Sequence, residues 1–347
     1  MSDEIHVRVE GRAGRITLDR PKALNALTHA MCLAIEQALD AWRDDDAVAA
    51  VVIDGAGDRA FCAGGDITAM HAAGLRGEWR YGQDFWRDEY RMNRKLFHFP
   101  KPVVAFLHGF TMGGGVGVGC HASHRVVNDT SRIAMPECGI GLVPDVGGSL
   151  WLARAPGRLG EFLGVTGYRM GPGDAIHAGF ADFNAPGDWE ALKARLCETG
   201  DPSVVDAASA APPEAPLAAW QAEIDRLFAG ETLGDIARGL AGEEGPAATH
   251  AREAMARNAP LSMACAVEII HRLGDDPTIE RALAQEFRFT YRALEHGDFV
   301  EGIRAQVIDK DRDPKWRHDG PEAVARAEVV RMLMPLGADG LNWEDEA

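Results

Sequence analysis

Two carboxylates stand in segments rich in glycine and proline. Glu137 follows Pro136 in an otherwise apolar stretch, and Asp145 belongs to a segment that reads Pro-Asp-Val-Gly-Gly. Apolar neighbours should desolvate the carboxylate of Glu137 and raise its pKa, which suits general acid–base catalysis near neutral pH. The alternative interpretation is structural, since a loop carboxylate can also cap helix N–H groups or face solvent. These two acids are the first candidates for catalysis.

Two glycine segments could supply peptide N–H groups to a developing negative charge. One is Gly113–Gly115, and the other is the pair Gly64-Gly65 within Phe61–Asp66. Glycine has no Cβ, so a ligand can approach these peptides closely, and two such donors are what an oxyanion hole needs. Tight packing of a strand against a helix would also favour such a run. No GxGxxG register fits Gly113–Gly119, so this run is not a dinucleotide-binding fingerprint.

Other catalytic and metal-binding patterns are weaker. His121 and His124 have no acidic third ligand at a suitable spacing, so a zinc site is not expected. The chain contains no G-x-S-x-G segment, which removes the serine nucleophile of one large class of hydrolases. Cys138 could be a nucleophile beside Glu137, but no base can be assigned to it, and a buried packing thiol is favoured.

The elements that must position these residues alternate between strands and helices. The segment from Thr28 to Trp42 has helical apolar periodicity, with Thr28 as its predicted N-cap. Strands separated by helices predict an α/β fold with crossover connections. The predicted strands are Ile5–Val9, Arg15–Leu18, Val51–Ile53, Val103–Leu107, 124–127 and 132–134.

The composition changes near Asp188, after which alanine, glutamate, leucine and arginine dominate. We therefore expect a core over residues 1–200 and a mainly helical region over 201–347. Ala207–Pro216, with three prolines, is the best candidate for a linker. A final helix is predicted over about Glu322–Leu333.

The overall composition narrows the class of protein. With 347 residues, 46% of them hydrophobic, the chain can bury a large core, and a net charge of −17 disfavours nucleic acid or an anionic membrane as a partner. No run approaches the roughly 20 apolar residues that span a bilayer. The first residues lack the basic and apolar parts of a secretory signal, and the six cysteines form no CxxC pair. A cytoplasmic protein with reduced thiols is expected.

Long motifs in the chain resemble a known family. Ile16–Ala26, Ala60–Ile67 and His108–Gly115 resemble the crotonase (enoyl-CoA hydratase/isomerase) superfamily, and residues 135–148, 163–167 and 298–316 are similar to its 3-hydroxyisobutyryl-CoA hydrolase branch. The resemblance extends from about residue 5 to residue 316 and is weakest over 200–260. It implies the ClpP/crotonase-like spiral of repeated ββα units, a helical C-terminal region, and a homo-oligomer, either a trimer or a hexamer.

The resemblance also implies roles for individual residues. The peptide N–H groups of Gly65 and Gly114 would hold the thioester oxygen, Glu137 would be the main catalytic group with Asp145 assisting, and Glu89 would bind substrate. Whether Glu137 attacks the carbonyl itself or activates water stays open. Coenzyme A, which is part of the substrate and not a separate cofactor, would lie along the loops that hold Lys22, Ala23, Leu24, Ala63, Gly64, Asp66 and Ile67.

One departure from the hydratase pattern favours hydrolysis. Hydratases carry one glutamate just after the triple glycine and a second in the Pro-Glu position, whereas this chain has Val116-Gly117 at the first place. The resemblance therefore implies hydrolysis of a short 3-hydroxyacyl-CoA thioester, with 3-hydroxyisobutyryl-CoA of valine breakdown first and the 3-hydroxypropionyl ester not excluded. The alternatives are an enoyl-CoA hydratase or isomerase that uses Glu137 alone, and a catalytically inactive acyl-CoA-binding protein.

Overall fold

The computed structural model describes residues 4–343 of the chain. Contacts divide the chain into two compact units. The sheet unit consists of Met1–Gly65, Asp88–Ala134 and Arg169–Pro216, and the helical unit consists of Asp66–Arg87, Met135–Tyr168 and Leu217–Ala347. Both units are built from segments that alternate along the chain, whereas the prediction was a single boundary near residue 200. The predicted division into 1–200 and 201–347 stays a prediction.

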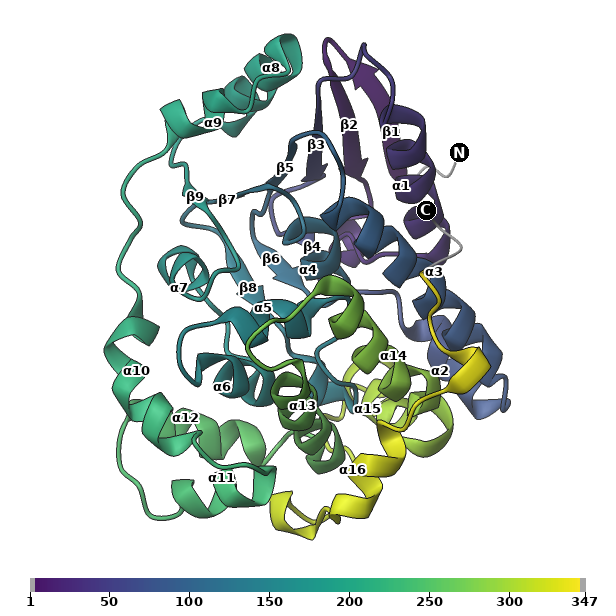
Figure 1. The fold of residues 1–347 in the computed structure, drawn as a ribbon, viewed down its shortest axis with the longest axis vertical. Helices are drawn as coiled ribbons and strands as arrows, with labels where there is room; N and C mark the ends of the chain where they lie inside the picture. Colours follow the sequence, from purple (N-terminus) through teal and green to yellow (C-terminus); the bar gives the residue numbers. More distant parts are fainter. Residues whose placement is uncertain (1–3, 344–347) are drawn as a thin grey trace. The chain divides into compact units, whose positions relative to one another are not determined.

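The larger sheet of the sheet unit has six strands in the order β1-β2-β3-β5-β7-β9 (Figure 1). Only the β1–β2 pair is antiparallel, and the other neighbours are parallel. The central strands β3 and β5 are almost completely buried, as expected for parallel strands covered on both faces. The strands are β1 (Ile5–Glu10), β2 (Ala13–Leu18), β3 (Ala50–Gly55), β5 (Val103–Phe106), β7 (His124–Val127) and β9 (Phe183–Asn184).

A second, three-stranded parallel sheet in the same unit has the order β4-β6-β8. Its strands are β4 (Ala60–Cys62), β6 (Phe110–Met112) and β8 (Arg132–Ala134). Along the chain each of them follows a strand of the larger sheet, so that β3 precedes β4, β5 precedes β6, and β7 precedes β8. This repeated pairing is the predicted crotonase arrangement, which is confirmed.

Helices of the sheet unit cover the larger sheet. Helix α1 (His29–Trp42) begins where the sequence predicts it, and the Thr28 hydroxyl accepts a hydrogen bond from the Met31 N–H at 3.3 Å. Helices α8 (Trp189–Thr199) and α9 (Ser203–Ala208) pack apolar side chains against Val52, Val104 and Phe106 of the sheet. The unit also holds α4 (Gly114–Gly119), α7 (Pro172–His177) and the part of α3 (Trp79–Phe97) that begins at Asp88.

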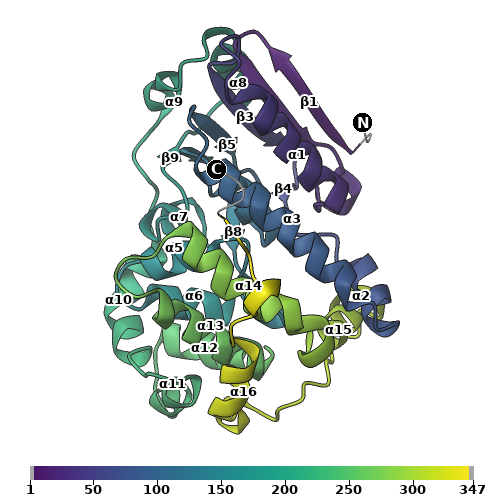
Figure 2. The ribbon, with the colours of Figure 1, turned by 45° about the vertical axis from the view of Figure 1, so that its right-hand side comes forward.

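The described residues of the helical unit form helices and turns and no strand. At its centre, α13 (Pro260–Leu273) is buried on nearly all sides and packs against α5, α6, α14 and α16 (Figure 2). The unit also holds the part of α3 up to Arg87 and all of α10 (Pro216–Leu227) except Pro216, which belongs to the sheet unit. Its other helices are α2 (Thr68–Leu75), α5 (Gly148–Arg154), α6 (Leu159–Thr166), α11 (Leu233–Leu240), α12 (Pro246–Met255), α14 (Ile279–His296), α15 (Phe299–Ile303) and α16 (Arg326–Met332).

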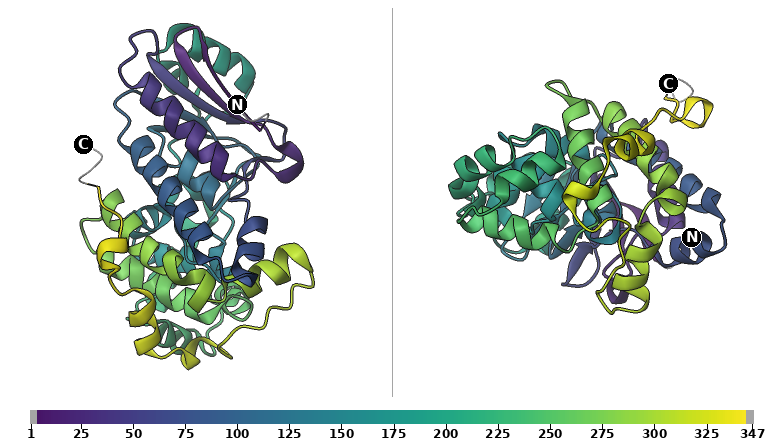
Figure 3. Two further views of the ribbon diagram at one scale, coloured as in Figure 1. Left: turned by 90° about the vertical axis from the view of Figure 1, so that its right-hand side faces the viewer. Right: turned by 90° about the horizontal axis from the view of Figure 1, so that it is seen from below.

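The end of the chain differs from the prediction. After the π-helical turn Arg304–Ile308, the chain runs irregularly to a short 3-10 turn at Pro321–Ala323 (Figure 3). The predicted final helix over Glu322–Leu333 is therefore wrong at its start. The backbone is extended at Val324 and Ala325, and α16 begins at Arg326. Ala325 is its N-cap residue, and the Ala325 N–H donates to the Glu328 carboxylate at 3.2 Å. Among residues 4–343, no helix is both long and apolar enough to cross a membrane.

Candidate active site

Gly65 and Gly114, the two predicted oxyanion donors, lie next to each other in the sheet unit. Gly65 follows β4, where it pairs with Leu27, and Gly114 is the first residue of α4. A Cβ atom added to Gly114 would lie 3.3 Å from the Gly65 peptide nitrogen. The N–H of a first helical residue has no acceptor within its own helix, so that of Gly114 can be offered to a ligand. The structure brings these two glycines together.

The carboxylate of Glu89 comes to the same place. Glu89 lies on α3 and is only 2% exposed, and its Oε1 atom would be 3.1 Å from a Cβ atom on Gly114. A carboxylate accepts hydrogen bonds, so this position suits a substrate group that donates one, such as a hydroxyl. Three of the predicted site residues are therefore neighbours in the sheet unit.

Backbone hydrogen bonds join the two segments that are predicted to hold coenzyme A. Lys22 and Ala23 are exposed in the 3-10 turn Pro21–Ala23, and Leu24 follows with a left-handed φ of 53°. The Ala63 N–H donates to the Leu24 carbonyl at 3.0 Å, and the Leu27 N–H donates to the Gly64 carbonyl at 2.9 Å. The turn at Lys22 and the loop after β4 therefore form one surface.

Asn25 holds this surface together, and its role was not predicted from the sequence. Its side chain is fully buried, and its Nδ2 donates to the carbonyls of Ala56 at 2.9 Å and Ala60 at 2.8 Å. Its Oδ1 accepts from the Arg20 N–H at 2.8 Å. Asn25 also has a positive φ of 55°, a conformation that asparagine tolerates better than most residues. A lone asparagine inside the apolar run Ala-Leu-Asn-Ala-Leu was the available signal.

Asp66 and Ile67 belong to the helical unit. Asp66 Oδ1 accepts a hydrogen bond from the Thr68 N–H at 3.4 Å, and Ile67 is the N-cap residue of α2. These contacts begin a helix. A structural role for both residues is thus visible, and their contact with coenzyme A stays a prediction.

Glu137 is a buried acid of the helical unit. It starts the 3-10 turn Glu137–Ile140, is 4% exposed, and its Oε2 atom has no hydrogen-bond partner among the described residues. Burial raises the pKa of this carboxyl well above its ordinary value, and the charges of Asp145 and Glu286 raise it further. A buried polar atom without a partner is costly, and such groups concentrate at functional sites. The predicted raised pKa is confirmed in direction and cause.

Asp145 lies in a strained turn of the same unit. It is 4% exposed, and its carbonyl accepts from the Gly148 N–H at 2.7 Å. The two residues inside the turn, Val146 and Gly147, have left-handed φ angles of 54° and 78°. This conformation is unusual for a β-branched side chain. Asp145 is near enough to Glu137 to raise its pKa by like-charge repulsion, so the two predicted acids lie together.

Glu286 is a third acid beside this pair, and it was not predicted from the sequence. It lies on α14, is 0% exposed, and accepts hydrogen bonds from the Gly147 N–H at 2.7 Å and the Ser149 N–H at 3.0 Å. The Ser149 hydroxyl makes a further short hydrogen bond with it. Burial raises the pKa of Glu286 to about 8. Its position on the apolar face of α14, among Ala282, Leu283 and Phe289, was a usable signal.

Cys138 is a packing thiol, as favoured from the sequence. It is 1% exposed, donates to the Gly164 carbonyl at 3.3 Å, and has a pKa raised well above its ordinary value by burial. A protonated buried thiol is a poor nucleophile. His121 packs edge-on against Phe97, and His124 stacks on Phe183. Within residues 4–343 no group of three His, Cys, Asp or Glu side chains could hold a metal ion.

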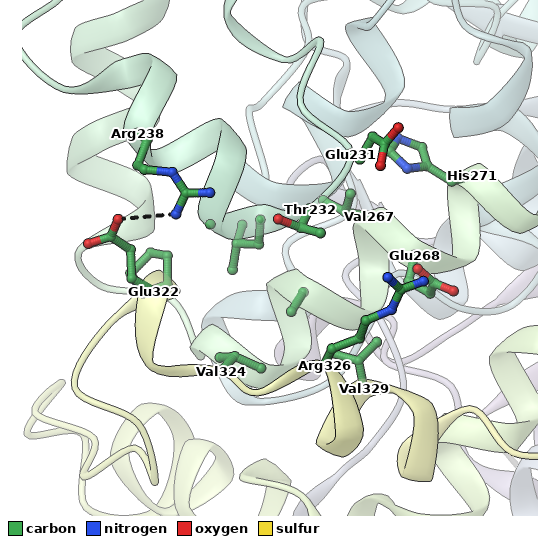
Figure 4. A pocket seen from close by; sticks show the side chains of 14 residues that line it. Glu231, Thr232, Arg238, Val267, Glu268, His271, Glu322, Val324, Arg326 and Val329 are labelled. Carbon is green, nitrogen blue, oxygen red and sulfur yellow. Dashed lines mark hydrogen bonds and ion pairs between the residues drawn. The ribbon is translucent and has the colours of Figure 1, made fainter.

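A cavity of about 530 Å³ opens elsewhere in the helical unit, and none of the predicted site residues lines it (Figure 4). Its wall carries charges of both signs, and Arg238 pairs with Glu322 across 3.5 Å. Its acids and bases alternate around apolar side chains such as Val267 and Val329, so the wall favours no particular ligand charge.

The comparisons with known proteins point to one family. The family model described as Enoyl-CoA hydratase/isomerase matches residues 13–333. The chain is 39% identical to the mitochondrial 3-hydroxyisobutyryl-CoA hydrolase of Danio rerio, over 88% of this chain and 83% of the relative. It is 33% identical to the protein of the same name from Homo sapiens, over 99% and 91%.

Two solved structures are similar over almost their whole length. The enoyl-CoA hydratase from Rhodobacter sphaeroides is 55% identical with a TM-score of 0.94, over 98% of this chain and all of that one. The carnitinyl-CoA dehydratase from Mycobacterium thermoresistibile is 40% identical with the same TM-score, over 99% and 100%.

These comparisons correct one prediction and confirm another. The predicted cytoplasmic location is wrong, because the curated relatives are named as mitochondrial proteins. Free cysteines indicate a reducing environment without distinguishing one such compartment from another. The resemblance drawn from the motifs is confirmed: the chain belongs to the enoyl-CoA hydratase/isomerase family.

Proposed function

We propose that this chain hydrolyses 3-hydroxyisobutyryl-CoA to 3-hydroxyisobutyrate and free coenzyme A. The observation that carries the proposal is the pair of buried acids Glu137 and Asp145, combined with α4, whose sequence Gly-Gly-Val-Gly-Val-Gly is fully buried and has no acid. A hydratase places one of its two glutamates at the position of Val116-Gly117. Curated relatives that carry the name of this hydrolase support the same activity.

In the proposed reaction, the peptide N–H groups of Gly65 and Gly114 donate to the thioester oxygen. Negative charge develops on this oxygen as the carbonyl carbon becomes tetrahedral, and fixed donors stabilise it without reorganisation. The adjacency of the two glycines supports this role. The carboxylate of Glu89 accepts a hydrogen bond from the 3-hydroxyl group, which selects hydroxylated acyl chains.

Glu137 then acts in its ionised form, by one of two routes. As a general base it takes a proton from water, the water oxygen bonds to the carbonyl carbon, the C–S bond breaks, and the proton passes to the departing sulfur. As a nucleophile its oxygen forms the bond to carbon, coenzyme A leaves as the thiolate, and water cleaves the resulting anhydride. Asp145 orients the water or the substrate hydroxyl in both routes.

A second candidate is hydration of an enoyl-CoA by Glu137 alone, which is favoured by the 55% identity to a solved structure named as an enoyl-CoA hydratase. The two reactions separate in one experiment. Thiol release from 3-hydroxyisobutyryl-CoA and loss of the enoyl absorbance of crotonyl-CoA are measured on the same purified protein. Thiol release with slow hydration is the expected result, and turnover of crotonyl-CoA without thiol release would reverse the assignment.

A homo-oligomer, trimer or hexamer, stays a prediction from the family.

A further inference from the structure

Glu286 is bound entirely to the loop that carries Asp145. Although α14 is far from this loop in sequence, the Oε2 atom of Glu286 accepts from the Gly147 N–H at 2.7 Å and its Oε1 atom accepts from the Ser149 N–H at 3.0 Å. The short contact with the Ser149 hydroxyl is a third bond to the same loop. Both carboxylate oxygens are therefore occupied by the segment that directly follows Asp145.

The loop needs such a partner because its backbone is strained. Val146 and Gly147 are both left-handed, and Val146 is β-branched and 1% exposed. In this turn the N–H groups of Gly147 and Ser149 both point to one carboxylate, as in the anion-binding concavities that turns form. The peptides at Gly147 and Ser149 also lie at the start of α5, where N–H groups lack helical acceptors. Without Glu286 these donors would be buried and unpaired.

We infer that Glu286 is a positioning residue, which fixes the strained turn at Val146 and thereby holds the Asp145 carboxylate beside Glu137. The inference rests on the proposed function only in that Glu137 is taken as the reacting group. The side chain of Glu286 itself touches the loop and acts on the reaction through it.

The carboxyl groups around Glu286 give the inference a measurable signature. The charge of Asp145 raises the pKa of Glu286, and the charges of Asp145 and Glu286 both raise the pKa of Glu137. Asp145 raises the pKa of Glu137 because of its fixed place. If the loop loosens, Asp145 moves away and water enters, so the pKa of Glu137 should fall toward its ordinary value. Glu286 adds a like charge of its own, so its removal lowers the pKa of Glu137 even if the loop does not move. A variant that loosens the loop but keeps the Glu286 carboxylate therefore reports on positioning alone.

The central test is Glu286→Gln. Glutamine fills the same space, but its amide nitrogen cannot accept, so one of the two backbone N–H groups loses its partner. We expect kcat to fall by roughly 10-fold to 100-fold, the size of effect that a small misplacement causes, with little change in KM for the acyl-CoA ester. The acidic limb of the pH profile of kcat should move to lower pH.

Two further variants separate positioning from stability. Glu161→Gln is the matched control, because Glu161 is an equally buried acid of the same unit, 3% exposed, that pairs with Arg158 and His271. It should lower the melting temperature and leave kcat and the acidic limb unchanged. Ser149→Ala removes the hydroxyl contact and keeps both backbone hydrogen bonds, so its loss of kcat should be smaller than that of Glu286→Gln. This variant keeps the inference testable if Glu286→Gln folds poorly.

A measurement without turnover distinguishes this inference from the proposed reaction. The pKa of Glu137 is followed by NMR of carbon-13-labelled glutamate carboxyls, with Glu137→Gln to assign the signal. A lower pKa in Ser149→Ala, which keeps the charge of Glu286, supports positioning even if 3-hydroxyisobutyryl-CoA is not the substrate, and kinetics are then read on crotonyl-CoA. An unchanged Glu137 pKa and wild-type kcat in a folded Glu286→Gln protein would overturn the inference.

Discussion

The backbone of Gly114 faces the peptide nitrogen of Gly65 so closely that a single added methyl group would lie 3.3 Å from it. The same methyl group would lie 3.1 Å from Glu89 Oε1 and 3.1 Å from Leu27 Cδ1. Nine in ten real Cβ contacts are longer than this, so these neighbours would have to shift. A side chain at position 114 therefore cannot be added without a shift of these neighbours.

This crowding predicts the effect of Gly114→Ala. The substitution should displace the Gly65 and Gly114 peptides by a few tenths of an ångström and lower kcat/KM by about 100-fold, since oxyanion donors depend on short, aligned contacts. The measurement is kcat/KM for 3-hydroxyisobutyryl-CoA, with a thermal melt to confirm folding. Gly171→Ala is the control, because no atom lies within 4 Å of its added Cβ and its φ of −73° suits alanine. Equal activity of the two variants would contradict the oxyanion role.

The buried carboxylate of Glu137 predicts opposite effects on activity and stability. Glu137→Gln removes proton acceptance, so kcat should fall by at least ~100-fold, while substrate binding changes little. An acid whose pKa is raised in the folded state stabilises the fold below its unfolded pKa of about 4.3, and this contribution is lost as pH rises toward the folded pKa. The glutamine variant should therefore melt at a higher temperature than the wild type at pH 7.5, with a smaller difference near pH 4.5. A fully active variant would remove Glu137 from the mechanism.

The charge of Asp145 predicts a shift in the pH dependence of the reaction. Since catalysis uses ionised Glu137, kcat should rise with pH along an acidic limb whose midpoint lies above about 4.3. Asp145→Asn removes a like charge and should move this limb to lower pH, with a smaller loss of maximal kcat than Glu137→Gln. The pH profiles of the wild type and the asparagine variant check this directly. A limb that stays in place would show that Asp145 does not act on Glu137 electrostatically.

Local patterns in the sequence predicted most of what is local in the structure. The helix from His29 with its cap at Thr28, the buried strands and the burial of Glu137 all follow from neighbouring residues. Glu286 and Asn25 were missed because their partners are distant: Glu286 binds peptides more than a hundred residues away, and Asn25 binds the carbonyls of Ala56 and Ala60. A single polar residue on an apolar face signals such a contact, but only the fold says what it contacts.

The place of Glu89 beside Gly114 predicts a change in substrate preference. If its carboxylate accepts a hydrogen bond from the 3-hydroxyl group, Glu89→Gln should weaken that contact and lower kcat/KM for 3-hydroxyisobutyryl-CoA by roughly 10-fold or more. Isobutyryl-CoA, which lacks the hydroxyl, should be affected much less. The ratio of kcat/KM for the two esters isolates this contact from general damage to the site, because damage lowers both values together. An unchanged ratio would mean that Glu89 does not recognise the hydroxyl group.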